Sequence, residues 1–90
     1  MLEIRPTCEN CNKFLPYDSK EAMICTFECT FCKDCVENLL QQVCPNCGGN
    51  FHNRPIRPKH LLEKYPVSKQ VIYNPVDLQK HQETMKKLKQ

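Results

Sequence analysis

The sequence predicts a small α+β domain with short strands, one helix in its first half and a basic, partly helical C-terminal extension. Three observations lead to this fold class: eight cysteines in a chain of 90 residues, short apolar segments between those cysteines, and a charge that changes sign near residue 50. A chain this short buries too little apolar surface to be stable on its core alone. We therefore expect the cysteines to supply much of the stability.

Most of the cysteines occur in pairs that are separated by two residues. The eight positions are Cys8, Cys11, Cys25, Cys29, Cys32, Cys35, Cys44 and Cys47. Two sulfurs at this spacing can face one ion, and two such pairs complete a four-thiolate shell around Zn²⁺. Eight ligands predict two structural Zn²⁺ ions per chain, and residues 1–50 are expected to be unfolded without them.

A disulfide scaffold and an iron centre are the alternatives to zinc. The chain does not begin with a basic stretch followed by an apolar run, so we expect no signal peptide, no transmembrane span and a cytoplasmic location. Thiols stay reduced in the cytoplasm, and disulfides across such tight loops would be strained. The segment from Cys44 to Gly48 would suit the iron-binding knuckle of a rubredoxin, but a second knuckle of that form is missing, so zinc is preferred.

Local patterns predict the elements of the first half. Residues 2–5 alternate like a short strand, and residues 22–25 form a second, apolar strand. Residues 33–43 contain no helix breaker, and their apolar side chains recur at spacings of three and four, so this segment predicts a helix with one buried face. Cys32 and Cys35 lie at its start, where a helix N-terminus stabilises thiolate charge.

Small polar residues and glycine lie next to the paired cysteines. Asn10 and Asn12 flank Cys11, and Gly48 follows Cys47. These residue types tolerate the left-handed turn that aims backbone N–H groups at a thiolate sulfur. The turns therefore favour metal ligation by the cysteines beside them.

The second half of the chain is basic. Residues 1–50 hold four basic and seven acidic side chains, a formal net charge of −3, whereas residues 51–90 hold nine basic and three acidic ones, a net charge of +6. Arg54, Arg57 and Lys59 alternate with prolines in an extended strap that could follow the phosphates of a nucleic acid. The alternative is a surface strand and linker that packs on the acidic first half.

A C-terminal helix is expected up to about residue 88, with Asn74 as its N-cap and Pro75 at its first position. Leu78, Met85 and Leu88 lie near one face of this helix. This face could dock on the first half, on a second subunit or on a partner, or the helix could stay solvated.

Spacing alone does not decide which four cysteines share an ion. A sequential arrangement joins the first four cysteines and then the last four. A nested arrangement joins the outer two pairs, and an interleaved arrangement alternates the pairs. All three arrangements satisfy the ligand count.

The segment 29–35, followed by an apolar helix and by Cys44-Pro45-Asn46-Cys47, resembles a RING finger in which cysteine replaces the usual histidine. The spacing agrees at all eight ligands, and Phe31 and Pro45 also fit the pattern. The resemblance implies an interleaved cross-brace in residues 1–58, which we call the head, with residues 59–90 as a basic tail. The implied ligand sets are Cys8, Cys11, Cys32 and Cys35 at site 1 and Cys25, Cys29, Cys44 and Cys47 at site 2. Each ion would then close long loops of the chain.

The head also resembles a small bacterial family that is known only as a domain of unknown function. This resemblance implies a bacterial source and a RING-like zinc fold, and it implies no activity. The tail from Lys59 onward lies outside it.

The RING resemblance also implies ubiquitin-ligase activity, and of the three positions that test this implication, Pro45 agrees and two disagree. Ligase-type RING domains place an aliphatic residue after the first ligand, where this chain has Glu9, and a basic residue after the eighth ligand, where it has Gly48. A carboxylate at an apolar docking surface would be desolvated at a cost of about several kcal/mol. We therefore expect a structural zinc-binding interaction or adaptor module with a protein partner, with nucleic-acid binding through Arg54, Arg57 and Lys59 as the second hypothesis and a ligase as the third.

No catalytic constellation is visible in the sequence. A catalytic zinc keeps an open position for water, whereas a shell of four thiolates is closed. The histidines that remain, His52, His60 and His81, are expected to be solvated surface side chains. The chain is therefore predicted not to be an enzyme.

Overall fold

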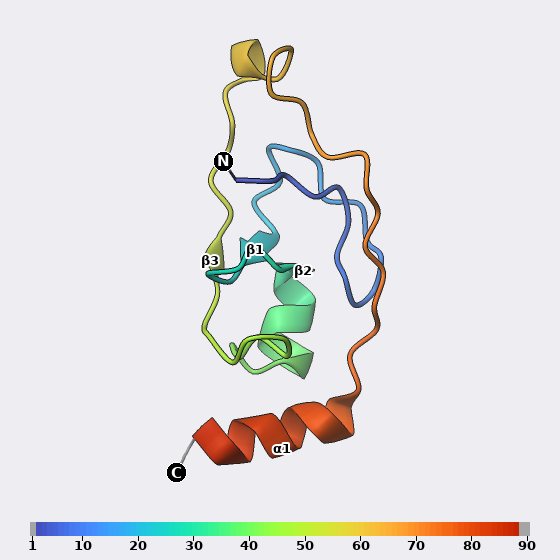
Figure 1. Ribbon diagram of the computed structural model, residues 1–90, viewed down its shortest axis with the longest axis vertical. Coiled ribbons are helices and arrows are strands. Elements are labelled where there is room, and N and C mark those ends of the chain that lie inside the picture. The colour runs from blue at the N-terminus through green and yellow to red at the C-terminus, as the bar shows by residue number, and fades with distance from the viewer. Residues whose placement is uncertain (1, 89–90) are drawn as a thin grey trace.

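The computed structural model describes residues 2–88 and shows a small three-stranded sheet in the head and a tail that runs along the head to a C-terminal helix (Figure 1). The elements in chain order are β1 (Ala22–Ile24), β2 (Thr30–Cys32), the π-helical turn η1 (Cys35–Leu39), β3 (His52–Asn53), the 3₁₀ turn η2 (Lys59–Leu61) and α1 (Leu78–Leu88). The molecule is elongated, with principal dimensions of 45 × 21 × 18 Å. Within residues 2–88, no helix has the length and apolar character that crossing a membrane requires. The predicted α+β class is confirmed.

The sheet is antiparallel and has the strand order β2-β1-β3. β1 and β2 form a hairpin in which Ala22 pairs with Cys32, and β3 returns from farther along the chain to pair His52 with Ile24. The strand predicted at residues 22–25 is thus confirmed over the three residues of β1. Because β3 joins β1 near its end, the loop between β1 and β2 lies close to the segment that leads into β3.

The strand predicted at residues 2–5 is wrong. This segment is irregular and bonds to later parts of the chain instead of to a strand. The backbone N–H of Ser68 donates to the carbonyl of Ile4 at 2.9 Å, and the guanidinium of Arg57 donates to the carbonyl of Leu2 at 2.6 Å. The alternating pattern reflects the burial of Ile4, which is 1% exposed, whereas the backbone groups beside it are satisfied by distant residues.

The helix predicted at residues 33–43 is shorter than expected. The turn η1 ends at Leu39, and the backbone N–H of the following Leu40 donates to the carbonyl of Cys35 at 2.8 Å, a wide π-type closure. Gln41 and Gln42 then adopt positive φ angles of 52° and 66°, and such left-handed residues cannot continue a right-handed helix. The apolar spacing still brings Leu40 into the core, where it is fully buried.

The tail is packed along the N-terminal part of the head (Figure 1). The backbone N–H of Asn74 donates to the carbonyl of Glu9 at 2.7 Å, and that of Val76 donates to Oδ1 of Asn10 at 2.9 Å. Because the two regions share these bonds, the predicted boundary at residue 58 marks a change of composition within one packed structure. The division into 1–58 and 59–90 stays a prediction, and residues 89 and 90 lie outside the described residues.

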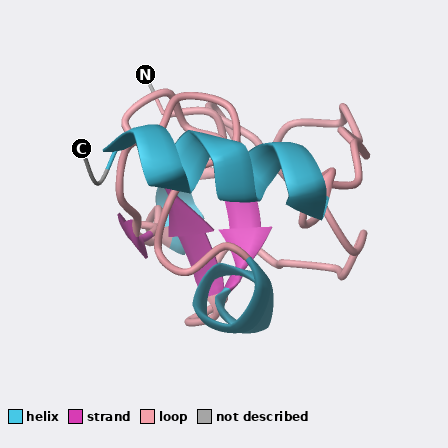
Figure 2. Cartoon of the chain, turned by 90° about the horizontal axis from the view of Figure 1, so that it is seen from below, coloured by secondary structure: helices cyan, strands magenta, loops and turns pink. Residues whose placement is uncertain are grey.

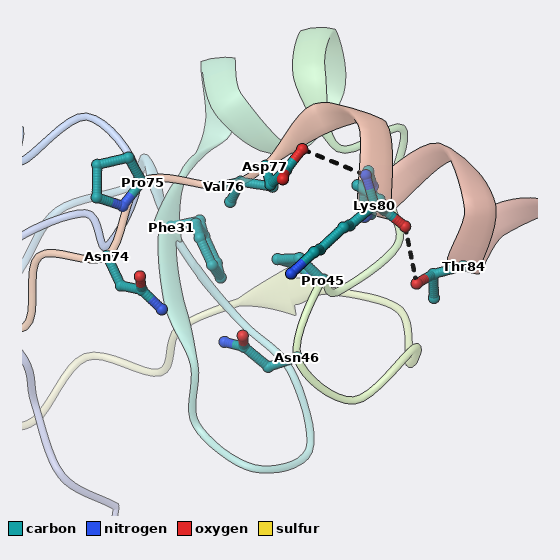
Figure 3. Close-up of a pocket in the computed structure, with 10 residues that line it drawn as sticks. Phe31, Pro45, Asn46, Asn74, Pro75, Val76, Asp77, Lys80 and Thr84 are labelled. Carbon is teal, nitrogen blue, oxygen red and sulfur yellow. Dashed lines mark hydrogen bonds between the residues drawn. The ribbon is translucent and has the colours of Figure 1, made fainter.

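The helix α1 starts later than expected because Asp77 caps it. Oδ1 of Asp77 accepts the backbone N–H groups of Gln79 at 3.0 Å and Lys80 at 3.3 Å, and Figure 3 shows the bond to Lys80. The N-cap predicted at Asn74 is therefore wrong. A helix that started at Asn74 would lose the bond from its backbone N–H to the head.

One face of α1 docks on the head, and Figure 2 shows the helix crossing it. His81 is 2% exposed, with its Nε2 2.8 Å from the carbonyl oxygen of Leu40, and Met85 is 8% exposed. Leu78 is 44% exposed, and the side chain of Leu88 lies outside the described part of the chain. Of the open alternatives for this helix, the structure therefore selects docking on the head, with His81 and Met85 as the contacts.

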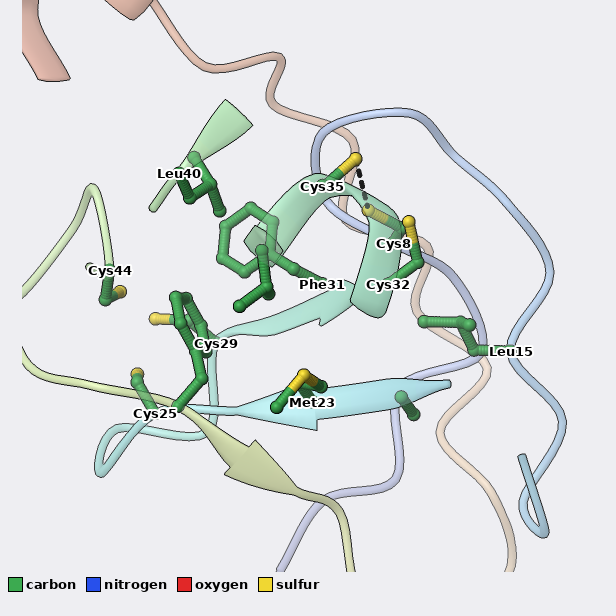
Figure 4. Packing of buried hydrophobic residues seen from close by; sticks show 13 residues of the cluster. Cys8, Leu15, Met23, Cys25, Cys29, Phe31, Cys32, Cys35, Leu40 and Cys44 are labelled. Atoms are coloured by element: carbon green, nitrogen blue, oxygen red, sulfur yellow. Dashed lines mark hydrogen bonds between the residues drawn. The ribbon is translucent and has the colours of Figure 1, made fainter. Parts of the chain in front are cut away.

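Cysteines and two aromatic rings build the core (Figure 4). Phe31 and Phe51 pack edge to face, with ring centroids 5.6 Å apart and planes at 79°. Six of the eight cysteines are buried around them: Cys8, Cys25, Cys29, Cys32, Cys35 and Cys44. A core in which so many side chains are thiols is arranged around sulfur chemistry as much as around apolar packing.

Candidate metal centre

Four cysteine sulfurs gather in a first cluster. The Sγ atoms of Cys8, Cys11, Cys32 and Cys35 all lie within 4.8 Å of one another. The Cys8 and Cys35 sulfurs are 3.9 Å apart, and the Cys11 and Cys32 sulfurs are 3.7 Å apart. A tetrahedral zinc with Zn–S bonds of about 2.3 Å has sulfurs about 3.8 Å apart. The first cluster therefore has the dimensions of a tetrahedral four-thiolate shell.

Two different local structures supply these sulfurs. Cys8 and Cys11 lie in a tight loop in which the backbone N–H of Cys8 donates to the carbonyl of Lys13 at 2.9 Å. Asn12 has a φ of 63°, which confirms the left-handed turn expected beside Cys11. The other two sulfurs come from Cys32 at the end of β2 and from the first residue of η1. The first cluster thus joins the N-terminal loop to the centre of the head.

Three sulfurs form a second cluster, and a fourth lies beside it. The Sγ atoms of Cys25, Cys44 and Cys47 lie within 4.8 Å of one another. Cys29 lies outside this 4.8 Å group, and the backbone N–H of Cys25 donates to its carbonyl at 3.3 Å. Figure 4 shows the sulfurs of Cys25, Cys29 and Cys44 facing one another. The second cluster joins the β1–β2 hairpin to the loop that precedes β3.

Left-handed residues shape both loops of the second cluster. Gly48 has a φ of 80°, as expected beside Cys47, and the backbone N–H of Gly49 donates to the Cys47 sulfur at 3.4 Å. Glu28 in the hairpin has a φ of 66°, and the backbone N–H of Phe27 donates to the Cys25 sulfur at 3.3 Å. The conformation of Glu28 could not be predicted from the sequence, because glutamate has no preference for it and only the closure of the hairpin imposes it.

Each cluster has one asparagine amide that donates to a sulfur. Nδ2 of Asn10 donates to Cys35 at 3.3 Å, and Nδ2 of Asn46 donates to Cys29 at 3.5 Å. A donor of this kind stabilises the negative thiolate that metal binding requires. This role of the two asparagines was not among the predictions from the sequence. The signal available was that each asparagine lies inside a pair of cysteines separated by two residues.

The environment of the thiols shifts their acidity in opposite directions. Burial raises the pKa of Cys35 and Cys44 well above the usual value for a thiol. Burial also raises the pKa of Cys11, but the backbone N–H of Lys13 and the neighbouring thiols outweigh it and lower that pKa. The Cys25 pKa is lowered in the same way, with Phe27 as the backbone donor. Each cluster therefore combines one thiol with a lowered pKa and buried thiols with a raised pKa, and metal binding has to displace the protons of the latter.

Thiolate ligands define what the two clusters can bind. Sulfur at this spacing suits Zn²⁺ and other soft cations, and four sulfurs leave no open position on a tetrahedral ion. The structure brings together all four members of the first predicted ligand set and three of the four members of the second. Two metal sites are therefore supported, whereas zinc as the metal and Cys29 as the eighth ligand stay predictions.

Glu9 is turned into the protein, which corrects the expectation that its carboxylate lies on an exposed docking surface. Its side chain is buried, and Oε2 accepts the backbone N–H of Thr30 at 2.7 Å and Nη1 of Arg5 at 3.0 Å. A buried carboxylate is stable only with such donors. Glu9 therefore ties the loop of the first cluster to β2.

The arginines of the basic strap are also used inside the protein. Arg54 is 3% exposed, and its guanidinium donates to the carbonyls of Arg5 at 2.8 Å and Pro16 at 2.7 Å. Burial lowers the pKa of Arg54, but the group stays protonated. The guanidinium of Arg57 donates to the carbonyls of Leu2 and Tyr65. Both arginines thus bond to carbonyls of the first half, as expected if the strap packs on it.

The histidines divide between surface and interior. His52 and His60 are exposed, as expected. His81 is buried, so the expectation that all three are solvated is wrong for it. The physical reason is its place on α1, where the ring bonds to the carbonyl at the end of η1.

These observations define the class of protein: a small cysteine-rich α+β protein with two clusters that can hold metal ions. Residues 1–57 match the family described as "Protein of unknown function (DUF1272)", and the chain belongs to that family. The match confirms the resemblance to a small bacterial family of unknown function. A similar protein, described as "Uncharacterized protein R02474" of Rhizobium meliloti (strain 1021), is 55% identical over 75 residues, which cover 83% of this chain and 89% of that protein. No solved structure matches the chain at a significant level.

Proposed function

We propose that this protein is a structural zinc protein with a RING-like cross-brace, and that it acts as an interaction or adaptor module in the cytoplasm rather than as an enzyme. The observation that carries the proposal is the first cluster, because it combines the first and third cysteine pairs in sulfurs at tetrahedral spacing. Combining these pairs is what an interleaved arrangement requires. All eight cysteines are free of disulfides, which is consistent with a reducing compartment.

The closed shells favour a structural role over catalysis. A four-thiolate shell has no open position for water or substrate. Within residues 2–88, the two cysteine clusters are the only groups in which three or more histidine, cysteine or acidic side chains converge. Because most of these cysteines are buried in the core, metal binding and folding would be coupled.

Exposed aromatic side chains on the loops of the head favour an interaction role. Phe27 is 73% exposed in the hairpin of the second cluster, while its backbone N–H is held by the Cys25 sulfur. Phe14 is 64% exposed beside the loop of the first cluster. Aromatic side chains held on a rigid backbone give large contact area at low entropy cost. We propose that Phe27 belongs to the surface that contacts a protein partner.

A ubiquitin-ligase role remains the third hypothesis. Pro45, the position that agrees with ligase-type RING domains, lines a cavity whose other wall is the tail from Asn74 to Thr84. A conjugating enzyme would have to displace this wall to reach Pro45. Because the side chain of Glu9 is buried, it places no carboxylate on the docking surface of a ligase. The tail opposite Pro45 is the feature that opposes a ligase role.

Metal content is the first test. Elemental analysis of untagged protein should give two zinc ions per chain. After substitution of ¹¹³Cd, correlation of each cadmium with the β protons of its ligands should give one set with Cys8, Cys11, Cys32 and Cys35 and another with Cys25, Cys29, Cys44 and Cys47. One metal ion per chain, or ligand sets that follow the sequential or nested order, would contradict the proposal.

The interaction role is tested by a change at the exposed aromatic ring. Phe27→Ser should abolish the binding of a partner that the wild-type protein retains from extracts of its source organism, without a change in zinc content. Val71→Ser is a matched control, because Val71 is also exposed, at 57%, and lies in the tail. Equal retention of the partner by wild type and Phe27→Ser would reject the proposed surface.

Nucleic-acid binding is the second candidate, and exposed lysines favour it. Lys59 is exposed in the strap, and Lys86 and Lys87 are exposed on α1. Binding through such groups would weaken by about 10-fold or more between 50 and 200 mM salt if two or more phosphates were contacted. A triple change of these lysines to glutamine should remove salt-dependent binding to oligonucleotides. Binding that survives this change would reject the lysine surface.

A further inference from the structure

Strand β3 forms one edge of the sheet (Figure 1). Its inner side pairs with β1, where Asn53 lies opposite Met23 and the backbone N–H of Arg54 donates to the carbonyl of Ala22 at 2.9 Å. In an antiparallel ladder, hydrogen-bonded pairs alternate with pairs whose N–H and C=O groups point away from each other. The backbone N–H and C=O of Asn53 are therefore directed away from β1, toward the edge.

The two edges of the sheet differ in how they are covered. At β2, the loop of the first cluster covers the edge, because the backbone N–H of Glu9 donates to the carbonyl of Thr30 at 3.0 Å and Oε2 of Glu9 accepts the N–H of Thr30. Within residues 2–88, no hydrogen bond is found to the outward backbone groups of Asn53. An edge of this kind accepts another extended chain, which presents a matching donor and acceptor on every second residue.

Two hollows adjoin the edge and share Pro55 as a common wall. Their volumes are about 250 and 260 Å³. A cavity of about 150 Å³ holds a benzene-sized group, so each hollow is large enough for one apolar side chain. The first is also lined by Ile24, Thr26 and His52, and the second by Leu2, Ile56 and Leu61.

Pro55 favours a partner chain over a second copy of this protein at the edge. In a symmetric pair of β3 strands centred on Asn53, Pro55 of each copy would lie opposite Phe51 of the other copy. Proline has no backbone N–H, so the symmetric pair would lack a hydrogen bond at both ends. A partner chain would lack it at one end only.

Two lysines lie near this edge. Nδ2 of Asn53 donates to the carbonyl of Lys20 at 2.9 Å, and Lys59 directly follows Pro58, which lines the second hollow. None of the four ion pairs found in residues 2–88 includes either lysine. The charges near the edge therefore suit acidic side chains on a partner.

We propose that β3 adds an extended segment of a partner protein as a fourth strand, with apolar side chains at alternate positions and acidic residues at its ends. The segment bonds to the backbone of Asn53 and fills the two hollows, since strand addition takes affinity from main-chain bonds and specificity from side-chain pockets. Thr26 of the first hollow precedes Phe27, so this surface continues the one proposed for Phe27. The inference rests on the proposed interaction role and specifies the conformation of the partner.

The first test is an NMR titration of the zinc-loaded full chain with the peptide acetyl-Asp-Val-Thr-Val-Thr-Val-Asp-amide. The peptide should bind with a Kd of about 1 mM, and at saturation it should slow hydrogen exchange of the Asn53 amide. Serine in place of valine should weaken binding about tenfold, because the hollows then stay unfilled. Lysine in place of aspartate should weaken it about threefold. Equal binding of the three peptides, or unchanged exchange at Asn53, would overturn the proposal.

N-methylated peptides test the main-chain bonds without any change in the protein. In an extended chain, the N–H groups of the valines point to one side and those of the threonines to the other. Methylation of one of these two sets should weaken binding about tenfold, because it removes the donors that face β3. Binding that survives both methylations would rule out strand addition.

Two variants at one position locate the site on β3. Asn53→Pro removes the outward N–H and leaves the bond of Arg54 to β1, and an edge strand tolerates proline where its N–H faces outward. Asn53→Ala loses the same side chain and keeps the N–H. Asn53→Pro should therefore bind the peptide about tenfold more weakly than Asn53→Ala does. Equal affinities of the two variants would overturn the assignment to this edge.

Two further outcomes separate this inference from its alternatives. A dimer that forms without peptide and is lost in Asn53→Pro would assign the edge to a second copy and overturn the proposal. If zinc-loaded protein binds none of the peptides but still retains a partner that Phe27→Ser loses, strand addition is rejected and the interaction role is kept. Loss of that partner in Asn53→Pro, but not in Asn53→Ala, would support both.

Discussion

The two cysteine clusters differ in how the rest of the chain supports them. The tail is bonded to the loop of the first cluster, because the backbone N–H of Val76 donates to Asn10 inside the first cysteine pair, and the four sulfurs of this cluster lie together. The second ends in an exposed hairpin where Phe27 is 73% accessible to solvent, and Cys29 lies beside the three converging sulfurs. The first cluster therefore connects distant parts of the chain, and the second shapes a surface.

Removal of metal from both clusters should have the largest effect. Structural zinc contributes about 10 to 16 kcal/mol per site, whereas a whole domain is stable by about 5 to 15 kcal/mol. Chelation should therefore unfold the head, with loss of circular dichroism and of dispersed NMR resonances, and zinc should restore both. A chelated protein that keeps its dispersed resonances would show that neither cluster holds the fold together.

Acidification should weaken metal binding strongly at both clusters. Burial raises the pKa of Cys35 and Cys44, so these thiols are protonated at neutral pH without metal and must lose their protons to bind it. The metal-bound state is therefore lost as pH falls, and the affinity should fall by up to about 10⁴-fold per pH unit for four protons released per site. Chelator competition at pH 6, 7 and 8 measures this slope. An affinity independent of pH would contradict thiolate ligation.

Loss of one exposed ligand from each cluster separates their roles. Cys11 and Cys47 are the two exposed cysteines, so Cys11→Ser and Cys47→Ser are matched changes. Each should release one zinc ion. Cys11→Ser should also free the tail, which speeds hydrogen exchange in α1 and lowers Tm by about 5 to 10 °C more than Cys47→Ser does. Equal exchange rates in α1 for the two variants would show that the tail depends on both clusters to the same extent.

Loss of the Arg54 side chain, which lies outside both clusters, should have the next largest effect on stability. Arg54→Met should destabilise the zinc-loaded protein by about 2 to 4 kcal/mol, because it leaves buried carbonyls without donors. Thermal unfolding measures the loss. Lys59→Met, at an exposed position of the same strap, is the control and should change stability little. Similar small effects of both changes would favour a solvated strap.

The asparagine donors should have the smallest effects. Asn10→Ala should weaken metal binding at the first cluster by about 10- to 100-fold, and Asn46→Ala should do the same at the second, because each removes one donor to a sulfur. Metal affinity of the two sites, measured by chelator competition, should change one site at a time. An equal effect of either change on both sites would show that the clusters are coupled.

The clusters and part of the fold could be predicted from the sequence because they depend on local spacing. The cysteine pairs, the left-handed Asn12 and Gly48 and the strand β1 each follow from a few neighbouring residues. The end of the predicted helix could not be predicted in this way. Gln41 and Gln42 adopt left-handed conformations that their residue types do not favour, because the chain must turn back there.

Side chains that serve distant partners were the hardest to predict. Glu9, Arg54 and His81 look like surface residues in the sequence, and all three are buried. Each bonds to a group more than 20 residues away along the chain. A composition rule that places charged residues outside fails where the tertiary structure supplies a specific partner.

A small α+β protein with two groups of cysteines suited to metal could be predicted from residue order alone, because ligand spacing and apolar periodicity are properties of short segments. Three features became visible only in the folded chain: Cys8 and Cys11 meet Cys32 and Cys35, the arginines of the basic strap bond inward, and the tail lines a cavity together with the head. These features join residues far apart in the chain, and their pairing depends on which arrangement gives buried sulfurs, carbonyls and charges their partners at the same time.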